Sequence, residues 1–302
     1  MTTTWLLVAA IFFVIFLKRN WDDISQRDWT VDWQYLSIAF FFFFLNKLVA
    51  GVQWALITHY RQEANGPNFI LYDICASFIS GMALYIPGNY WNLAALYKLS
   101  TKRGESGLST SVGIFYQVAL NMWASGLVGL YALYNLYPLN IYYYLGAVLL
   151  LVCLPPVVLH PKIGKMLVGK FSKLPWLDTF VLKHEEPFKL QLFLIMPVAN
   201  IVAGGVANFF LAKALFPGLA NEIFLLMVSA WALAWIAGYI TPIAPAGLGV
   251  REGVFVLFLK TYMASGLALV VTVASRIMLA LVDFIFGSLA LLWLRKLKHV
   301  PA

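Results

Sequence analysis

Long apolar runs alternate with short polar connections along most of this chain. A membrane-spanning helix needs about 20 mostly apolar residues, because each residue advances ~1.5 Å and the hydrocarbon layer is ~30 Å thick. This rule predicts an all-α, polytopic integral membrane protein with about 7–8 spans, and shorter helical pieces at 90–99 and 251–263. The predicted spans are 3–17, 35–58, 68–86, 107–134, 141–159, 190–213, 222–241 and 265–294.

Composition supports this class. With 62% hydrophobic and 11% charged residues, the chain has too little polar surface for a water-soluble globule of 302 residues. The net charge of +8 comes from cations in short connections beside apolar runs, which are topology signals and lipid-headgroup partners rather than a nucleic-acid surface. The two cysteines, Cys75 and Cys153, both lie inside apolar runs. We therefore expect no disulfide framework, no metal site, no cofactor and no nucleic-acid partner.

The longest polar connection, 160–189, carries six lysines with apolar residues at near-helical spacing between them. This pattern predicts an amphipathic surface segment, and lysine-rich short loops remain on the cytoplasmic side. No stretch is long and polar enough to form a soluble catalytic domain. The prediction is one transmembrane domain over 1–302, in which the span 141–159 and the segment 160–189 link two halves.

Those halves, about 35–134 and 190–294, form a weak internal repeat. A shift of 158 residues superposes three spans of one half on three spans of the other, and it places Pro87 of YIPGNYWN on Pro245 of PIAPAGLG. Paired Pro/Gly interruptions in two halves are typical of a transporter site built from discontinuous helices. Chance spacing of ordinary turns is the alternative.

The orientation of the repeat depends on what the interrupted segments do. If each dips into the membrane and returns on one side, three crossings separate the halves and the repeat is inverted. If each crosses once, the repeat is parallel. We favour the re-entrant, inverted arrangement, because that symmetry supplies two access states from one fold.

The segment 241–253, TPIAPAGLGVREG, places a charged helix break at membrane depth. Pro242 and Pro245 each remove a backbone donor and end the preceding helix, while Gly247 and Gly249 permit a tight backbone path. Irregular backbone survives at this depth only where protein covers it or where it lines a wet cavity. The segment is therefore a candidate cavity wall.

A new helix is predicted to start near Val250, with Arg251 in its first turn. Free N–H groups and the helix dipole make such an end suitable for an anion. Neighbours on a helix point about 100° apart, so we expect Arg251 and Glu252 to find partners elsewhere. An interfacial cap, with both charges touching headgroup water, is the alternative.

Further charges lie inside the predicted spans. Arg276 and Asp283 are two helical turns apart and share one face of the final span, and Lys47 lies mid-span in FFFFLNKLVAG. A charge at that depth costs several kcal/mol and is usually buried inside the bundle. Two interpretations remain open: ion pairs of Arg276 with Glu252 or of Asp283 with Lys47, or a cationic pocket whose guanidinium matches a phosphate. Asp73 is either a counter-ion or a proton-coupled group.

Three stretches together, APAGLGVREG, SRIMLALVD and YIPGNYW, resemble the flippase-like transmembrane family typified by the membrane domain of lysylphosphatidylglycerol synthases. The resemblance covers roughly 35–294. It implies a prokaryotic plasma-membrane protein that moves a lipid between leaflets, either an aminoacylated phospholipid or a polyprenyl-phosphate-linked or related glycolipid. It also implies re-entrant helices around a central lipid cavity.

The chain departs from that family in its amino-terminal half. Asn92 stands where family members often carry an acidic residue, and Gln117 and Val118 stand where they carry a Glu-Arg pair. We therefore expect the anion site mainly on the carboxy-terminal half. The aminoacyl-transferring soluble domain of the family is absent from this sequence, so we expect a transporter and not an enzyme.

The resulting hypothesis is transbilayer movement of an anionic lipid through a cavity with a cationic headgroup site. Its partners are that lipid, the surrounding membrane lipids and a glycosyltransferase or other lipid-modifying enzyme, and a homodimer is left open. The alternatives are a membrane-embedded glycosyl or phosphoryl transferase that uses Asp22 and Asp23, or a non-transporting partner of such an enzyme. The predicted site residues are Lys47, Asn92, Gln117, Gly247, Gly249, Arg251, Glu252, Arg276 and Asp283.

Overall fold

All regular secondary structure in the described part of the chain is helical, which confirms the all-α prediction. The structure is a computed structural model that describes residues 18, 30–61, 67–86, 90–137, 140–158, 187–241, 247 and 249–297. In chain order the elements are α3 (Trp33–Arg61), α4 (Pro67–Met82), the 3-10 turn η1 (Ala83–Tyr85), α5 (Trp91–Lys102), α6 (Gly107–Leu136), α7 (Ile141–Val158), α9 (Pro187–Leu215), the 3-10 turn η3 (Asn221–Ile223), α10 (Phe224–Ile240), α11 (Val250–Leu259) and α12 (Ser265–Leu297).

Five of these helical stretches are long and apolar enough to cross a membrane. They lie in α3, α6, α9, η3 with α10, and α12, at five of the predicted spans. The helices at two more predicted spans, α4 with η1 and α7, are apolar but shorter. The predicted span 3–17 and most of the predicted segment 160–189 lie outside the described residues. These helices indicate a multi-pass membrane protein.

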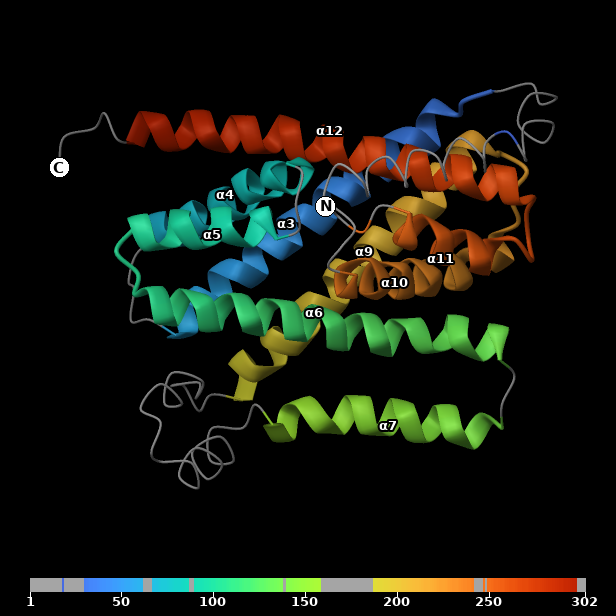
Figure 1. Cartoon of the computed structure of the whole chain (residues 1–302), viewed down its shortest axis with the longest axis horizontal. Helices are drawn as coiled ribbons and strands as arrows, with labels where there is room; N and C mark the ends of the chain where they lie inside the picture. Colours follow the sequence, from blue (N-terminus) through green and yellow to red (C-terminus); the bar gives the residue numbers. More distant parts are fainter. Residues whose placement is uncertain are drawn as a thin grey trace.

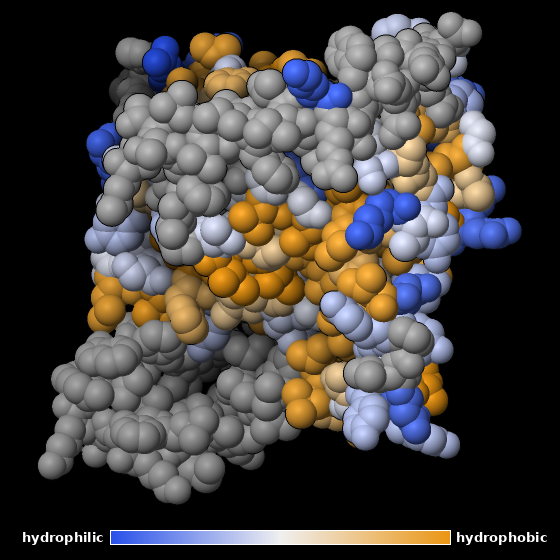
Figure 2. All heavy atoms as spheres, turned by 45° about the vertical axis from the view of Figure 1, so that its right-hand side comes forward, coloured by the Kyte–Doolittle hydropathy of each residue, from blue (hydrophilic) through white to orange (hydrophobic). Residues whose placement is uncertain are grey.

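The outer surface of the bundle is apolar. On α7, Tyr142, Leu149 and Leu150 each expose more than half of their area, and hydrophobic residues occupy the middle of the face in Figure 2 while most hydrophilic ones lie nearer its margins. Water-soluble monomers rarely expose contiguous apolar area on this scale. A lipid environment explains the exposure.

Two long helices, α3 and α9, pack along each other in opposite directions through the middle of the molecule (Figure 1). Asp32, whose side chain caps the start of α3 by accepting from the N–H of Tyr35, donates its own N–H to Ala214 O at the end of α9, 2.9 Å away. Farther along, Asn46 Nδ2 donates to Asn200 O at 2.7 Å. The other two long helices, α6 and α12, also run in opposite directions (Figure 1).

The short helices form two hairpins. One consists of α4, η1 and α5, and the other of α10 and α11; they enter from opposite ends of the molecule's long axis (Figure 1). The first hairpin packs on α12, and the second packs on α6. Each hairpin therefore lies against a long helix of the other half, which ties the two halves together.

The two halves share one order of elements: long helix, hairpin, long helix. The final long helices begin at Gly107 and Ser265, which are 158 residues apart, so this pair matches the shift found in the sequence. The first long helices follow a different spacing, since Asn46 and its bonding partner Asn200 are 154 residues apart. The repeat in the fold thus contains small length differences that a single shift does not describe.

Equivalent glycines support this alignment. A Cβ on Gly51 of α3 would lie 3.3 Å from Ile74 Cα on α4, and a Cβ on Gly205 of α9 would lie 2.6 Å from Val228 Cα on α10. Gly51 and Ile74 each lie 154 residues before their counterparts, Gly205 and Val228. Small residues at these two places let the long helix and the hairpin of each half approach closely.

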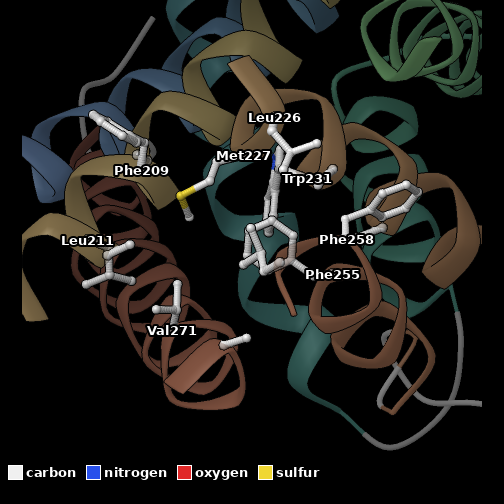
Figure 3. Packing of buried hydrophobic residues seen from close by; sticks show 14 of the residues in the cluster. Phe209, Leu211, Leu226, Met227, Trp231, Phe255, Phe258 and Val271 are labelled. Atoms are coloured by element: carbon white, nitrogen blue, oxygen red, sulfur yellow. The ribbon is translucent and has the colours of Figure 1, made fainter. Parts of the chain in front are cut away.

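The largest core cluster joins the second hairpin to α9 and α12. Figure 3 shows Phe209, Leu226, Trp231 and Phe255 in this cluster, with the Trp231 and Phe255 rings adjacent. Those two rings meet edge to face, with centroids 6.2 Å apart. Packing of this kind restricts rotamers, so Trp231 offers a fixed ring face to the region beside it.

Candidate functional site

A cavity of about 210 Å³ lies where the two hairpins meet, lined by residues from all of α3 to α6 and α9 to α12. Five of the predicted site residues line it: Lys47, Asn92, Gln117, Arg251 and Arg276. These positions come from both halves of the chain. The fold therefore brings together residues that are more than 200 positions apart in sequence.

Two glycines shape the tip of the second hairpin. Gly247 and Gly249 have φ of 68° and 86°, in the left-handed region where other residues are strained. A Cβ on Gly247 would lie 2.6 Å from Gly238 Cα, so the backbone passes directly against α10. This is the tight path expected from the two glycines. Pro242 and Pro245 lie outside the described residues.

Glu252 connects that tip to α12. Its Oε2 accepts a hydrogen bond from the N–H of Gly249 at 2.7 Å, as a glutamate three residues into a helix commonly does. Its Oε1 accepts from Arg276 Nε at 2.6 Å. Arg276 is thus paired, as one sequence interpretation proposed, yet it also lines the cavity.

The second predicted ion pair is present as well. Lys47 Nζ lies 2.8 Å from both carboxylate oxygens of Asp283, and Tyr85 OH donates to Asp283 Oδ2 at 2.9 Å. Asp283 is fully buried, and a Cβ on Gly81 would lie 2.6 Å from its Oδ1, so glycine leaves room for the carboxylate. The pair joins α3 and α12, while η1 supplies the phenol.

Arg251 differs from the other two cations of the site. Its guanidinium carbon lies 3.8 Å from the centroid of the Trp231 ring, which is close contact for a cation on an aromatic face. Within the described part of the chain no carboxylate forms an ion pair with it, and its buried Nε has no hydrogen-bond partner. A desolvated donor of this kind is costly unless a ligand satisfies it.

Among the described residues, the cations of the site outnumber the carboxylates bonded to them. Lys47, Arg251 and Arg276 are three cations, while Glu252 and Asp283 are the only two carboxylates bonded to them among the described residues. In the part of the chain that the structure describes, this leaves one cation, Arg251, without a bonded carboxylate. The arrangement can bind a monoanion through a flat guanidinium that Trp231 holds in place.

The part of the lining that comes from α5 and α6 is neutral. Asn92, Gln117, Val118 and Asn121 lie there. Gln117 Nε2 donates to Ala50 O at 3.3 Å, which is a long bond, and Asn121 Oδ1 accepts from Asn200 at 3.4 Å. This part of the lining therefore supplies amide donors and acceptors and no charge.

Sequence reasoning missed the aromatic residues of the site. Trp231, Trp235 and Tyr239 all line the cavity from α10, and Tyr85 bonds Asp283. The three α10 residues recur every four positions, which places them on one helix face. That spacing just ahead of the break at 241–253 is the signal that could have found them.

Asp73 lies apart from the cavity, in a second ionic cluster at the base of the first hairpin. Arg103 Nη1 is 2.8 Å from Asp73 Oδ2, and Arg103 Nη2 also bonds Glu105. Thr58 donates to Asp73 at 2.6 Å. Asp73 is therefore buried and paired with Arg103, as the counter-ion alternative from the sequence expects.

The described residues contain no group of three or more His, Cys, Asp or Glu side chains that could hold a metal ion. Asp22 and Asp23, the residues of the predicted transferase alternative, lie outside the described residues. No protein-family model matches the chain, and no curated protein matches it.

Proposed function

We propose that this protein moves an anionic lipid between the two leaflets of a membrane and binds the lipid phosphate in the cavity between the hairpins. The observation that carries the proposal is the Arg251 guanidinium, which stacks on Trp231, has no carboxylate partner among the described residues and lines the cavity. A phosphate oxygen is a suitable acceptor for its buried Nε.

The size of the cavity favours a headgroup over a whole lipid. At about 210 Å³ it is smaller than the ~300–1,000 Å³ of pockets that enclose a drug-sized ligand. Apolar side chains cover much of the outside of the bundle. In this account the phosphate enters the cavity and the hydrocarbon chains remain in the bilayer.

The two hairpins support alternating access. Because they enter from opposite ends of the long axis and the long helices run in opposite directions (Figure 1), we take them as re-entrant segments of an inverted repeat. Movement of one hairpin at a time would open the cavity to one leaflet and then to the other. The resemblance to the flippase-like family agrees with this proposal, and the prokaryotic plasma membrane as its location rests on that resemblance alone.

The test is leaflet exchange of fluorescent phosphatidylglycerol in vesicles that contain the purified full chain. For Arg251→Gln we expect exchange to slow by about 10-fold to 100-fold, because hydrogen bonds to charged groups contribute ~1.5–3 kcal/mol. Lys260→Gln is the matched control, since it removes an exposed cation that directly follows the far end of the same helix, α11.

Equal exchange by wild type, Arg251→Gln and Lys260→Gln would overturn the proposal and would leave Arg251 with a structural role. Exchange that Arg251→Gln slows and Lys260→Gln does not would support it. Size-exclusion profiles of the two variants check that both remain folded.

A further inference from the structure

We infer that the headgroup this cavity takes is a neutral polyhydroxyl ring, such as a sugar or a cyclitol, joined to its lipid through a single phosphodiester. The inference rests on the proposed function and narrows its substrate class. It comes from the described residues that line the cavity besides Arg251, which include a set of amides and a row of aromatic rings but no carboxylate.

The charge of the lining argues against an aminoacylated headgroup. Among the described residues that line the cavity there are three cations and no Asp or Glu. The nearest carboxylates are occupied, since Asp283 accepts from Lys47 and Tyr85, and Glu252 accepts from Gly249 and Arg276. An ammonium group would meet three cations and, among the described lining residues, no carboxylate to pair with, which costs free energy in a desolvated site.

The amides suit hydroxyl groups. An amide offers donors and an acceptor together, and a hydroxyl group both donates and accepts, so the two match in either direction. The Asn46, Asn121 and Asn200 side chains bond one another. Asn92 and the carbonyl oxygen of Gln117 have no hydrogen-bond partner among the described residues, so they have capacity for a ligand.

The aromatic residues suit the C–H face of a ring. Trp235 and Tyr239 stack with centroids 5.1 Å apart and an interplanar angle of 20°, and Tyr90 of the first hairpin meets Tyr239 at 5.9 Å. Aromatic faces carry partial negative charge and attract the partly positive C–H groups of a saturated ring. All three residues line the cavity.

The order of Trp231 and Trp235 along α10 relates the proposed phosphate position at Arg251 to the proposed position of the ring. Trp231, which holds Arg251, and Trp235 are one turn apart on the same helix face, ~5–6 Å between Cβ atoms. A phosphate at Arg251 therefore places a directly attached ring beside Trp235, in a cavity that Asn92 and Gln117 also line. A volume of about 210 Å³ suits one ring rather than an oligosaccharide.

The experiment compares two lipids with identical acyl chains and equal charge, phosphatidylinositol and phosphatidylglycerol, in vesicles that contain the full chain. We expect phosphatidylinositol to be exchanged about tenfold faster, the ratio that ~1.4 kcal/mol gives. Trp235→Leu removes this preference, whereas Trp235→Tyr, which keeps a ring face, retains most of it. Tyr143→Leu is the matched control, because Tyr143 is 72% exposed on α7 and outside the cavity.

The outcomes separate the inference from the proposed function. Equal exchange of the two lipids that still needs Arg251, or faster exchange of lysyl-phosphatidylglycerol, overturns the inference and leaves lipid movement standing. If exchange of neither lipid depends on Arg251, both the inference and the proposed function are overturned. A glucosyl-phosphoryl polyprenol, which carries another neutral polyhydroxyl ring on a single phosphodiester, is the third lipid; exchange faster than that of phosphatidylglycerol supports the inference, and slower exchange counts against it.

Discussion

The two halves of the molecule have the same order of helices but place their ionic clusters at opposite ends of their hairpins. In the first half, Asp73, Arg103 and Glu105 form a cluster at the base of the α4–α5 hairpin. In the second half, Arg251 and Glu252 lie at the tip of the α10–α11 hairpin, against the cavity. The first cluster has its cation fully paired, while the second leaves Arg251 without a carboxylate among the described residues.

The equivalent positions show what this difference means. The starts of α5 and α11 are 159 residues apart, which makes Asn92 the equivalent of Arg251. The starts of α6 and α12 are 158 residues apart, which makes Val118 the equivalent of Arg276. Because the first half forms the same hairpin and long helix with neutral residues at these places, the fold does not require cations there. This comparison supports the proposal that Arg251 binds a ligand, whereas Arg276 and Asp283 also join helices through their pairs with Glu252 and Lys47.

The largest effect expected from this comparison concerns Asp283 and its equivalent 158 residues earlier, Ser125. Asp283→Ala leaves Lys47 without its buried partner and should lower stability by about 3–5 kcal/mol. Ser125→Ala should change it by less than about 1 kcal/mol, because its buried hydroxyl has no hydrogen-bond partner in the structure. Thermal unfolding in detergent measures both. Similar losses for the two variants would contradict the assigned pairing.

The close approach of long helix and hairpin gives the next largest effect. Gly205→Ala puts a Cβ 2.6 Å from Val228 Cα and should cost about 1–3 kcal/mol, whereas Gly51→Ala meets Ile74 Cα at 3.3 Å and should cost less. The same unfolding measurement applies. A larger loss of stability for Gly51→Ala than for Gly205→Ala would contradict the closer approach of the helices at Gly205.

The smallest effect is expected where the second helix of each hairpin begins. Both α5 and α11 start after a residue with positive φ, Tyr90 at 74° and Gly249 at 86°. Gly249→Ala should cost about 1–2 kcal/mol, the penalty for a side chain in this conformation. Tyr90→Gly relieves the same strain but loses the ring contact with Tyr239, so its net change should be within about 1 kcal/mol. A Gly249→Ala variant as stable as the wild type would contradict this, because the backbone at the tip of the α10–α11 hairpin would then have relaxed to accept the side chain.

Much of the fold follows from local pattern. Apolar runs of sufficient length predicted the long helices, and the start of α11 at Val250 follows from glycines that permit positive φ just ahead of it. The single shift of 158 residues described only the final pair of long helices well. Insertions between helices change the spacing without changing the packing, so a uniform shift could not find the 154-residue relation of Asn46 and Asn200.

The ion-pair interpretation of the sequence named both pairs that the structure shows, Arg276 with Glu252 and Asp283 with Lys47. A charge inside a span signals a partner, but the sequence alone left this interpretation beside that of a cationic pocket, because Lys47 and Asp283 are 236 positions apart and meet where α3 packs against α12. The four-residue spacing of Trp231, Trp235 and Tyr239 marks one face of α10, but this spacing is the same whether the face packs in the core or lies under a cation. Only the tertiary structure separates these cases.

The most direct test of the central claim is the affinity of the purified full chain for short-chain phosphatidylglycerol, measured for wild type, Arg251→Gln and Lys260→Gln. If the unpaired guanidinium holds the phosphate, wild type and Lys260→Gln bind saturably with equal affinity, and Arg251→Gln binds at least about tenfold more weakly, a loss of ~1.4 kcal/mol. Equal affinity of all three proteins for this anionic lipid would contradict the account.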